Sequence, residues 1–266
     1  MRLYGVVLVG WFRRYATYRM ATAAGVFTNT VFGFIMAYAY IALWDERPQL
    51  GGYDVSQAVT YVWLGQALLA AGALMGGGFE VELIERIRTG DIAIDLYRPA
   101  DLQLWWLACD LGRGLFQLVG RGVVPMAIGA LAFDLALPGS VLTWVAFSGC
   151  VALALVVSFA LRFLVALSAF WLLDGAGVAQ LSWLAGMFFS GMLLPLTLFP
   201  GVLGELARAL PWSALLQVPA DVFLGQRTGW GVVEAYAFQA GWALALLALG
   251  RLVQTAATRR VVVQGG

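Results

Sequence analysis

The feature of this sequence that most constrains its fold is a series of apolar runs of about 20 residues each, the length of helix that crosses a bilayer. The chain of 266 residues is 62% hydrophobic and only 12% charged, whereas soluble domains have about 25% charged residues. We therefore expect an all-α, polytopic membrane protein, with one transmembrane domain that occupies residues 1–266.

Six runs are long enough to be transmembrane helices. They lie at about 24–44, 55–75, 105–134, 141–173, 178–199 and 232–252. The fourth run exceeds what one crossing needs, so we expect a long tilted helix that projects into the cytoplasm. Six crossings place both termini on the same side of the membrane.

The distribution of arginine predicts the orientation. The N-terminal segment contains four arginines and no acid, and the segment from Arg251 onward contains three arginines and no acid. Cytoplasmic loops are enriched in Lys and Arg. Both termini of this multi-pass membrane protein are therefore expected in the cytoplasm.

Residues 1–20 combine aromatic and basic side chains. Trp11, Phe12, Tyr15 and Tyr18 alternate with arginines, a pattern typical of an amphipathic helix that lies in the membrane interface. Charged residues extend too far into this segment for a cleaved signal peptide.

Between the second and third runs lies a polar segment, residues 79–101, with nine charged residues. Phe79, Leu83 and Ile87 recur every four residues, which predicts a short helix, and Glu82 and Arg86 are spaced as an i,i+4 ion pair. Gly90 favours a helix end, and the Arg98–Pro99 pair favours an extended exit. The segment is either a solvated loop or a docking element for a cytoplasmic partner.

Composition excludes several kinds of chemistry. The chain has no His and no Lys, and all 16 basic residues are Arg. Ser-His and Cys-His pairs, His metal sites and Lys Schiff bases are therefore impossible within it. Gly76–Gly78 lacks the Lys of a phosphate-binding loop. A net charge of +1 argues against nucleic acid as a partner.

The connection between the fifth and sixth runs is rich in proline. It contains Pro195, Pro200, Pro211 and Pro219, half of the eight prolines. Leu203, Leu206, Ala207 and Leu210 form a helical apolar stripe, and a second short amphipathic piece is expected at 212–223. Such short segments do not span a bilayer. We expect residues 200–226 to form an extracytoplasmic cap or re-entrant element.

Three arginines fall within or beside apolar runs, where a charge must face protein or water. Arg113 and Arg121 belong to the third run and Arg162 to the fourth. They either line a translocation path for an anionic or amphipathic substrate, or pair with Asp110 or another subunit, or extend to the headgroups.

Several short motifs have a familiar order along the chain. They comprise Tyr18–Arg19, 60–67 (TYVWLGQA), 87–93 (IRTGDIA), 95–99 (DLYRP), 190–195 (SGMLLP), 198–200 (LFP), 210–211 (LP) and Pro219. Together they resemble the permease subunits of ABC-2-type ATP-binding-cassette exporters. The resemblance is greatest to the bacterial branch that combines two different permeases with a separate ATPase, and it implies a location in the bacterial inner membrane.

This resemblance implies that the helix Glu80–Arg88 is a coupling helix that docks on the ATPase. The residues expected to dock are Glu80, Glu82, Leu83, Glu85, Arg86, Arg88, Gly90 and Arg98. The proline-rich segment would form re-entrant helices over the exit, with Pro195, Pro200, Leu206 and Pro211 as gate residues.

The resemblance also implies the partners: two copies of the ATPase and a second permease, in this branch a different chain. ATP and Mg would bind to the ATPase, and this chain would bind no cofactor and catalyse no reaction. An ion-coupled secondary transporter is the main alternative, followed by a membrane scaffold or an intramembrane enzyme.

Overall fold

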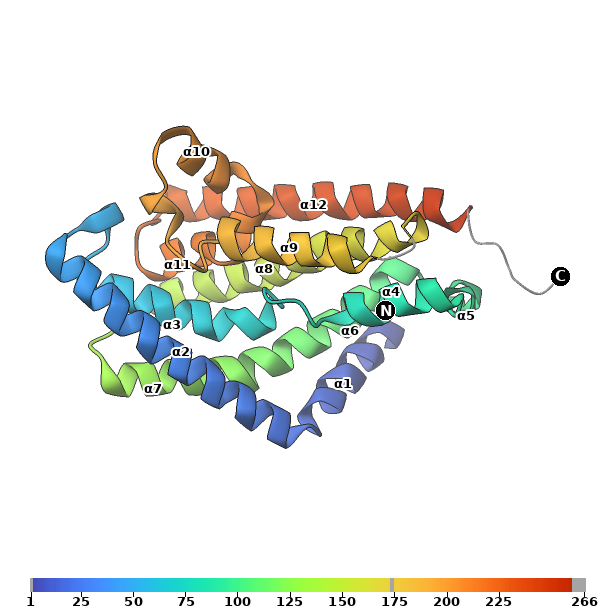
Figure 1. Cartoon of the computed structure of the whole chain (residues 1–266), viewed down its shortest axis with the longest axis horizontal. Coiled ribbons are helices and arrows are strands. Elements are labelled where there is room, and N and C mark those ends of the chain that lie inside the picture. Colours follow the sequence, from blue (N-terminus) through green and yellow to red (C-terminus); the bar gives the residue numbers. More distant parts are fainter. Residues whose placement is uncertain (1, 173–174, 260–266) are drawn as a thin grey trace.

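The computed structural model describes residues 2–172 and 175–259, and every regular element in this part of the chain is helical (Figure 1). Arg260, one of the arginines used for orientation, lies outside the described residues. The α-helices are α1 (Arg2–Ala16), α2 (Arg19–Glu46), α3 (Val55–Ala71), α4 (Phe79–Thr89), α5 (Ile92–Tyr97), α6 (Leu102–Gln117), α7 (Val124–Ala132), α8 (Val141–Leu167), α9 (Ala176–Phe189), α10 (Gly201–Ala209), α11 (Gln217–Phe223) and α12 (Trp230–Thr258).

Four helices in the described residues are long and apolar enough to cross a membrane. They are α2, the continuous stretch Leu102–Ala132, the stretch Val141–Phe170, and α12. The second joins α6 to α7 through a π-helical turn, η2 (Leu118–Val123), and the third extends α8 by a 3-10 turn, η3 (Ser168–Phe170). The helices predicted from the first, third, fourth and sixth apolar runs are therefore confirmed.

The second and fifth runs form shorter helices than predicted. The α3 helix ends at Ala71 rather than near residue 75, because Ala73, Gly76 and Gly77 adopt positive φ angles. The α9 helix ends at Phe189 rather than residue 199. Gly191 has a φ of +88° there, and its carbonyl accepts a hydrogen bond from the Tyr61 hydroxyl at 3.0 Å.

The N-terminal helix is also shorter than the predicted segment 1–20. α1 ends at Ala16, and Arg19 already belongs to α2. α1 packs along α6. The two backbones approach so closely at Gly112 that a β-carbon there would overlap the carbonyl oxygen of Leu8. The helix itself is confirmed, whereas its position in the membrane interface stays a prediction.

α8 lies at the centre of the molecule. In its most apolar window 67% of the residues are buried, against 22% or fewer in the other three long helices. It packs against α12 along much of its length and also contacts α4, α6 and α11. The N-terminal end of α1 and the C-terminal end of α12 lie at the same end of the molecule as α4 and α5. Helices α10 and α11 lie toward the opposite end (Figure 1).

The proline-rich segment divides into an exposed and a buried part. Helix α10 is largely exposed, with Leu206 at 52%. By contrast, the 3-10 turn η5 (Pro211–Leu215) and α11 are almost entirely buried. The piece expected to be amphipathic at 212–223 is instead buried on nearly all sides, because η5 and α11 both pack against α8. That residues 200–226 form a re-entrant element stays a prediction.

A polar cluster fixes α11 inside the protein. The Gln217 amide donates to the Tyr53 hydroxyl and to Asp221, both at 2.8 Å. Its oxygen accepts from the Tyr61 hydroxyl at 3.0 Å and from the Leu196 N–H at 2.7 Å. One side chain therefore holds α11 against α3 and against the turn that follows α9.

Replacement of Gln217 by Leu should destabilise the protein by about 1–3 kcal/mol, because several buried polar groups lose their partner at once. The measurement is the thermal unfolding midpoint of the purified protein in detergent. Gln180→Leu, at an exposed position of α9, is the matched control and should leave the midpoint near that of the unchanged protein. Equal midpoints for the two variants would contradict this account of α11.

Candidate functional site

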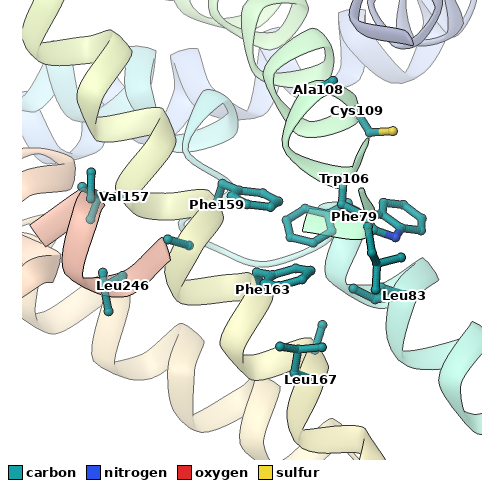
Figure 2. Packing of buried hydrophobic residues seen from close by; sticks show 14 of the residues in the cluster. Phe79, Leu83, Trp106, Ala108, Cys109, Val157, Phe159, Phe163, Leu167 and Leu246 are labelled. Carbon is teal, nitrogen blue, oxygen red and sulfur yellow. The ribbon is translucent and has the colours of Figure 1, made fainter. Parts of the chain in front are cut away.

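The polar segment begins with a helix whose apolar side is inserted in the core. Phe79 and Leu83 of α4 are buried, and the Phe79 ring lies 4.9 Å from that of Phe159, centre to centre. Figure 2 shows Phe79 between Trp106 of α6 and the two phenylalanines of α8, Phe159 and Phe163. The predicted helix is confirmed, and so is its end, because Gly90 is the C-cap in the left-handed conformation.

One charged residue of α4 points into the protein. Glu80 is only 4% exposed, and one of its oxygens accepts a hydrogen bond from Arg162 of α8 at 2.9 Å. Its other oxygen accepts from the N–H of Gly78 at 2.9 Å. This ion pair joins the polar segment directly to the central helix.

Asp110 of α6 completes the buried network. It accepts hydrogen bonds from Arg113 at 2.7 Å and from the guanidinium of Arg162. Arg113 also donates to the carbonyls of Ala70 and Ala71 at the end of α3, both at 2.8 Å. The network therefore joins α3, α4, α6 and α8.

The charges in this network balance. Two arginines face two carboxylates, and all four residues are at most 8% exposed. Burial of an ion costs several kcal/mol, which only a complete set of partners can offset. We call Glu80, Asp110, Arg113 and Arg162 the buried ion network.

The three arginines expected in the path therefore differ. Arg113 and Arg162 are neutralised within the chain, as the pairing alternative anticipated. Arg121, in η2, forms no ion pair with any residue that the structure describes. Like Arg113, it lines a cavity.

On its outer side the polar segment has a second set of ion pairs. Arg86 donates two hydrogen bonds to Asp95, at 2.6 and 2.9 Å, and Arg98 lies 3.1 Å from the same carboxylate. The predicted Glu82–Arg86 pair is wrong, because Arg86 turns toward α5 instead. Glu82 lies 3.5 Å from Arg14 of α1.

These contacts keep the outer charges ionised. The hydrogen bond from Arg88, at 2.9 Å, lowers the pKa of Glu85. The hydrogen bonds to Asp95 raise the pKa of Arg86. Both shifts favour the charged forms of Glu85 and Arg86.

Sequence reasoning missed the helix α5. Ile92 is buried, whereas Ile94 is 58% and Tyr97 93% exposed. The spacing of Ile92 and Leu96, four residues apart, was the available signal. α5 thus presents two large apolar side chains next to the exposed charges of α4.

The structure separates the residues predicted to dock. Glu80 and Leu83 are buried and have no surface for a partner, because one faces Arg162 and the other the core. Glu85, Arg88, Gly90 and Arg98 are exposed, and Glu82 and Arg86 are half-buried.

The predicted gate residues do not form one group. Pro195 and Pro211 are buried, whereas Pro200 precedes the exposed α10 and Leu206 lies on it. In the described residues no cluster of three or more Cys, Asp or Glu side chains could hold a metal ion.

Comparison with known families gives one match. The model of a family described as ABC-2 family transporter proteins matches residues 27–265, which is well over half of the chain. No curated protein matches the chain.

Loss of Arg162 should destabilise the protein by about 3–5 kcal/mol, because Arg162→Leu leaves Glu80 buried without its ion pair. The double variant Arg162→Leu/Glu80→Leu should lose less stability than the two single variants lose together. The difference, which is the coupling energy of the pair, should be about 0.5–3 kcal/mol. Thermal unfolding in detergent measures all three variants. Arg208→Leu, at an exposed position of α10, is the control, and strictly additive losses would refute the coupling.

Proposed function

Because the chain belongs to the ABC-2 transporter family, we propose that it is the permease of an ATP-driven exporter powered by a separate cytoplasmic ATPase. The family assigns it to membrane transport. The observation that most supports an ATP-driven mechanism is that the polar segment has a buried side and an exposed side. Its inner side is tied to the membrane helices by the buried ion network, and its outer side is exposed.

In the proposed topology the chain crosses the membrane six times. Two shorter helices, α3 and α9, would provide the other two crossings. They have 17 and 14 residues, and at 1.5 Å per residue they are about 26 and 21 Å long. Both are shorter than the ~30 Å hydrocarbon core. Flanking turns and the buried segment η5–α11 would complete their crossings, and the arginine-rich end would face the cytoplasm.

The docking surface for the ATPase combines charge and apolar area. It comprises the exposed residues Glu85, Arg88, Gly90, Ile94, Tyr97 and Arg98. An aromatic side chain surrounded by polar groups is typical of the central contact in a protein interface. Tyr97 occupies that position here.

Movement of this surface would reach the membrane helices through α4. A displacement of α4 acts on Arg162 through Glu80, and on α6 through Asp110. An ATPase that binds ATP in only one of two conformations shifts the permease between them by differential affinity. The buried ion network thus transmits the movement, and the work comes from the ATPase.

The assembly would contain two ATPase subunits and a second permease, with ATP and Mg bound by the ATPase. The alternative, an ion-coupled transporter, needs a carboxylate in the bundle that can change its protonation. Asp110 and Glu80 are held in ion pairs with arginine. At the buried ion network this arrangement favours the ATP-driven mechanism. Asp221 of α11 is a further buried carboxylate, which accepts hydrogen bonds from Tyr53 and Gln217.

Removal of the apolar contact should weaken the docking of the ATPase. Ile94→Ala/Tyr97→Ala is expected to reduce co-purification of the ATPase at least tenfold, because these two exposed side chains supply the apolar part of the proposed surface. The measurement is the amount of ATPase retained on the tagged permease after washing.

The control is Leu142→Ala, a residue that is 77% exposed at the start of α8, far from the polar segment in the chain. It should retain the ATPase fully. Full retention by Ile94→Ala/Tyr97→Ala, in a protein that unfolds at an unchanged temperature, would contradict the proposed docking surface.

A further inference from the structure

Arg121 occupies an unusual turn of the α6–α7 helix. It lies in η2, the π-helical turn, between Gly120 and Gly122. A β-carbon on Gly122 would lie 2.7 Å from the carbonyl oxygen of Ala67, so α3 packs directly against this turn. π-Helical turns occur frequently at functional sites.

The guanidinium of Arg121 has no counter-charge among the described residues. Its Nε is buried without a hydrogen-bond partner in the described part of the chain. It packs against Gly25 of α2, where a β-carbon would overlap it. An arginine at this depth is costly unless it faces water, protein or a ligand.

Two cavities meet at Arg121. An inner cavity of about 390 Å³ lies between α2, α3, η2 and the end of α9. An outer cavity of about 300 Å³ lies at the corner between α1 and α2, the V-shaped junction visible in Figure 1. Arg121 and Gln117 line both cavities, which are of the size typical of ligand sites.

The inner cavity is apolar with a few polar groups. Phe32, Met36, Met187 and Met192 line it, and methionine adapts to acyl chains of varied shape. Among the described residues, the side-chain oxygens of Gln66 and Gln117 have no donor. These two oxygens could accept hydrogen bonds from hydroxyl groups of a ligand.

The outer cavity is basic. Arg14 and Arg121 line it together with the two tyrosines Tyr15 and Tyr18, and no described carboxylate lines either cavity. The contact of Arg14 with Glu82 is long, at 3.5 Å, and the two side chains are 53% and 40% exposed. An anionic group in this cavity would face two guanidinium groups.

We propose that the two cavities form one binding site for a singly anionic amphiphile with an acyl chain. The carboxylate or phosphate of the head contacts Arg121 and Arg14, and the chain extends into the methionine-lined inner cavity. The site rests on the proposed export function, in which it loads the substrate from the membrane surface beside α1.

The test uses the purified full chain, without the ATPase, in phosphatidylcholine nanodiscs. The probe is a palmitate analogue with a diazirine at the end of its chain, and the measurement is the concentration dependence of photo-crosslinking to the peptides that contain Met36, Met187 or Met192. The site predicts saturable labelling of these peptides. The matching alcohol, which lacks the charge, should label them at least tenfold less.

Arg121→Gln should raise the probe concentration needed for half-maximal labelling at least tenfold. The variant should fold, because it removes a half-buried charge that has no ion-pair partner among the described residues, and its unfolding midpoint should not fall. Arg121→Lys should retain part of the affinity. Gly25→Ala should weaken binding through displacement of the guanidinium, and Arg208→Gln, on the exposed α10, should bind as the unchanged protein does.

Competition identifies the source of the amphiphile. Displacement of the probe by phosphatidylglycerol in the nanodisc indicates a membrane lipid, and its failure indicates a separate anionic amphiphile. Equal labelling by the alcohol, or unchanged affinity in a folded Arg121→Gln, would overturn the proposal. Because the ATPase is absent from this test, a negative result does not bear on the proposed docking surface at Ile94 and Tyr97. A negative result in the docking test likewise does not bear on this binding site.

Discussion

The fold depends on one buried contact, the guanidinium of Arg162 between the carboxylates of Asp110 and Glu80. A lone charge in the centre of a helix bundle is too costly to persist. Each partner therefore requires the others, and the helices that bear them are fixed together. Through Glu80, the polar segment becomes part of the membrane bundle. The same contact that neutralises the arginine of α8 also holds α4 against α8.

Arg113 and Arg121 illustrate how the same residue type acquires two roles. The two residues belong to one helical stretch and are eight positions apart. Arg113 meets Asp110 and the carbonyl groups that α3 exposes where it ends, at Ala70 and Ala71. Arg121 lies about two turns further along the helix, within the π-helical turn η2. There it is beyond the reach of Asp110, and it faces the cavities beside α2.

The polar segment and the proline-rich segment both owe their final arrangement to side-chain partners. Periodicity in α4 correctly predicted a helix with Phe79 and Leu83 on one face, but it could not distinguish which charges point outward. Glu80 follows Phe79 and turns inward because Arg162 is there. In the proline-rich segment, the sequence predicted a short amphipathic piece at 212–223. The structure buries it, because Gln217 forms hydrogen bonds with Tyr53 and Tyr61, which lie 164 and 156 residues earlier in the chain.

The sequence by itself determined the class of the protein, its long helices and the chemistry that it lacks. Apolar length, helical periodicity and Gly90 are local properties, and local properties are written in consecutive residues. Tertiary structure alone decided which charges of α4 point inward, the burial of residues 212–223, and the partner of each charge in the buried ion network. The physical reason is that an ion pair or a buried amide depends on groups from other helices. Which arginine is neutralised and which one is left to face a cavity is settled only when those helices pack.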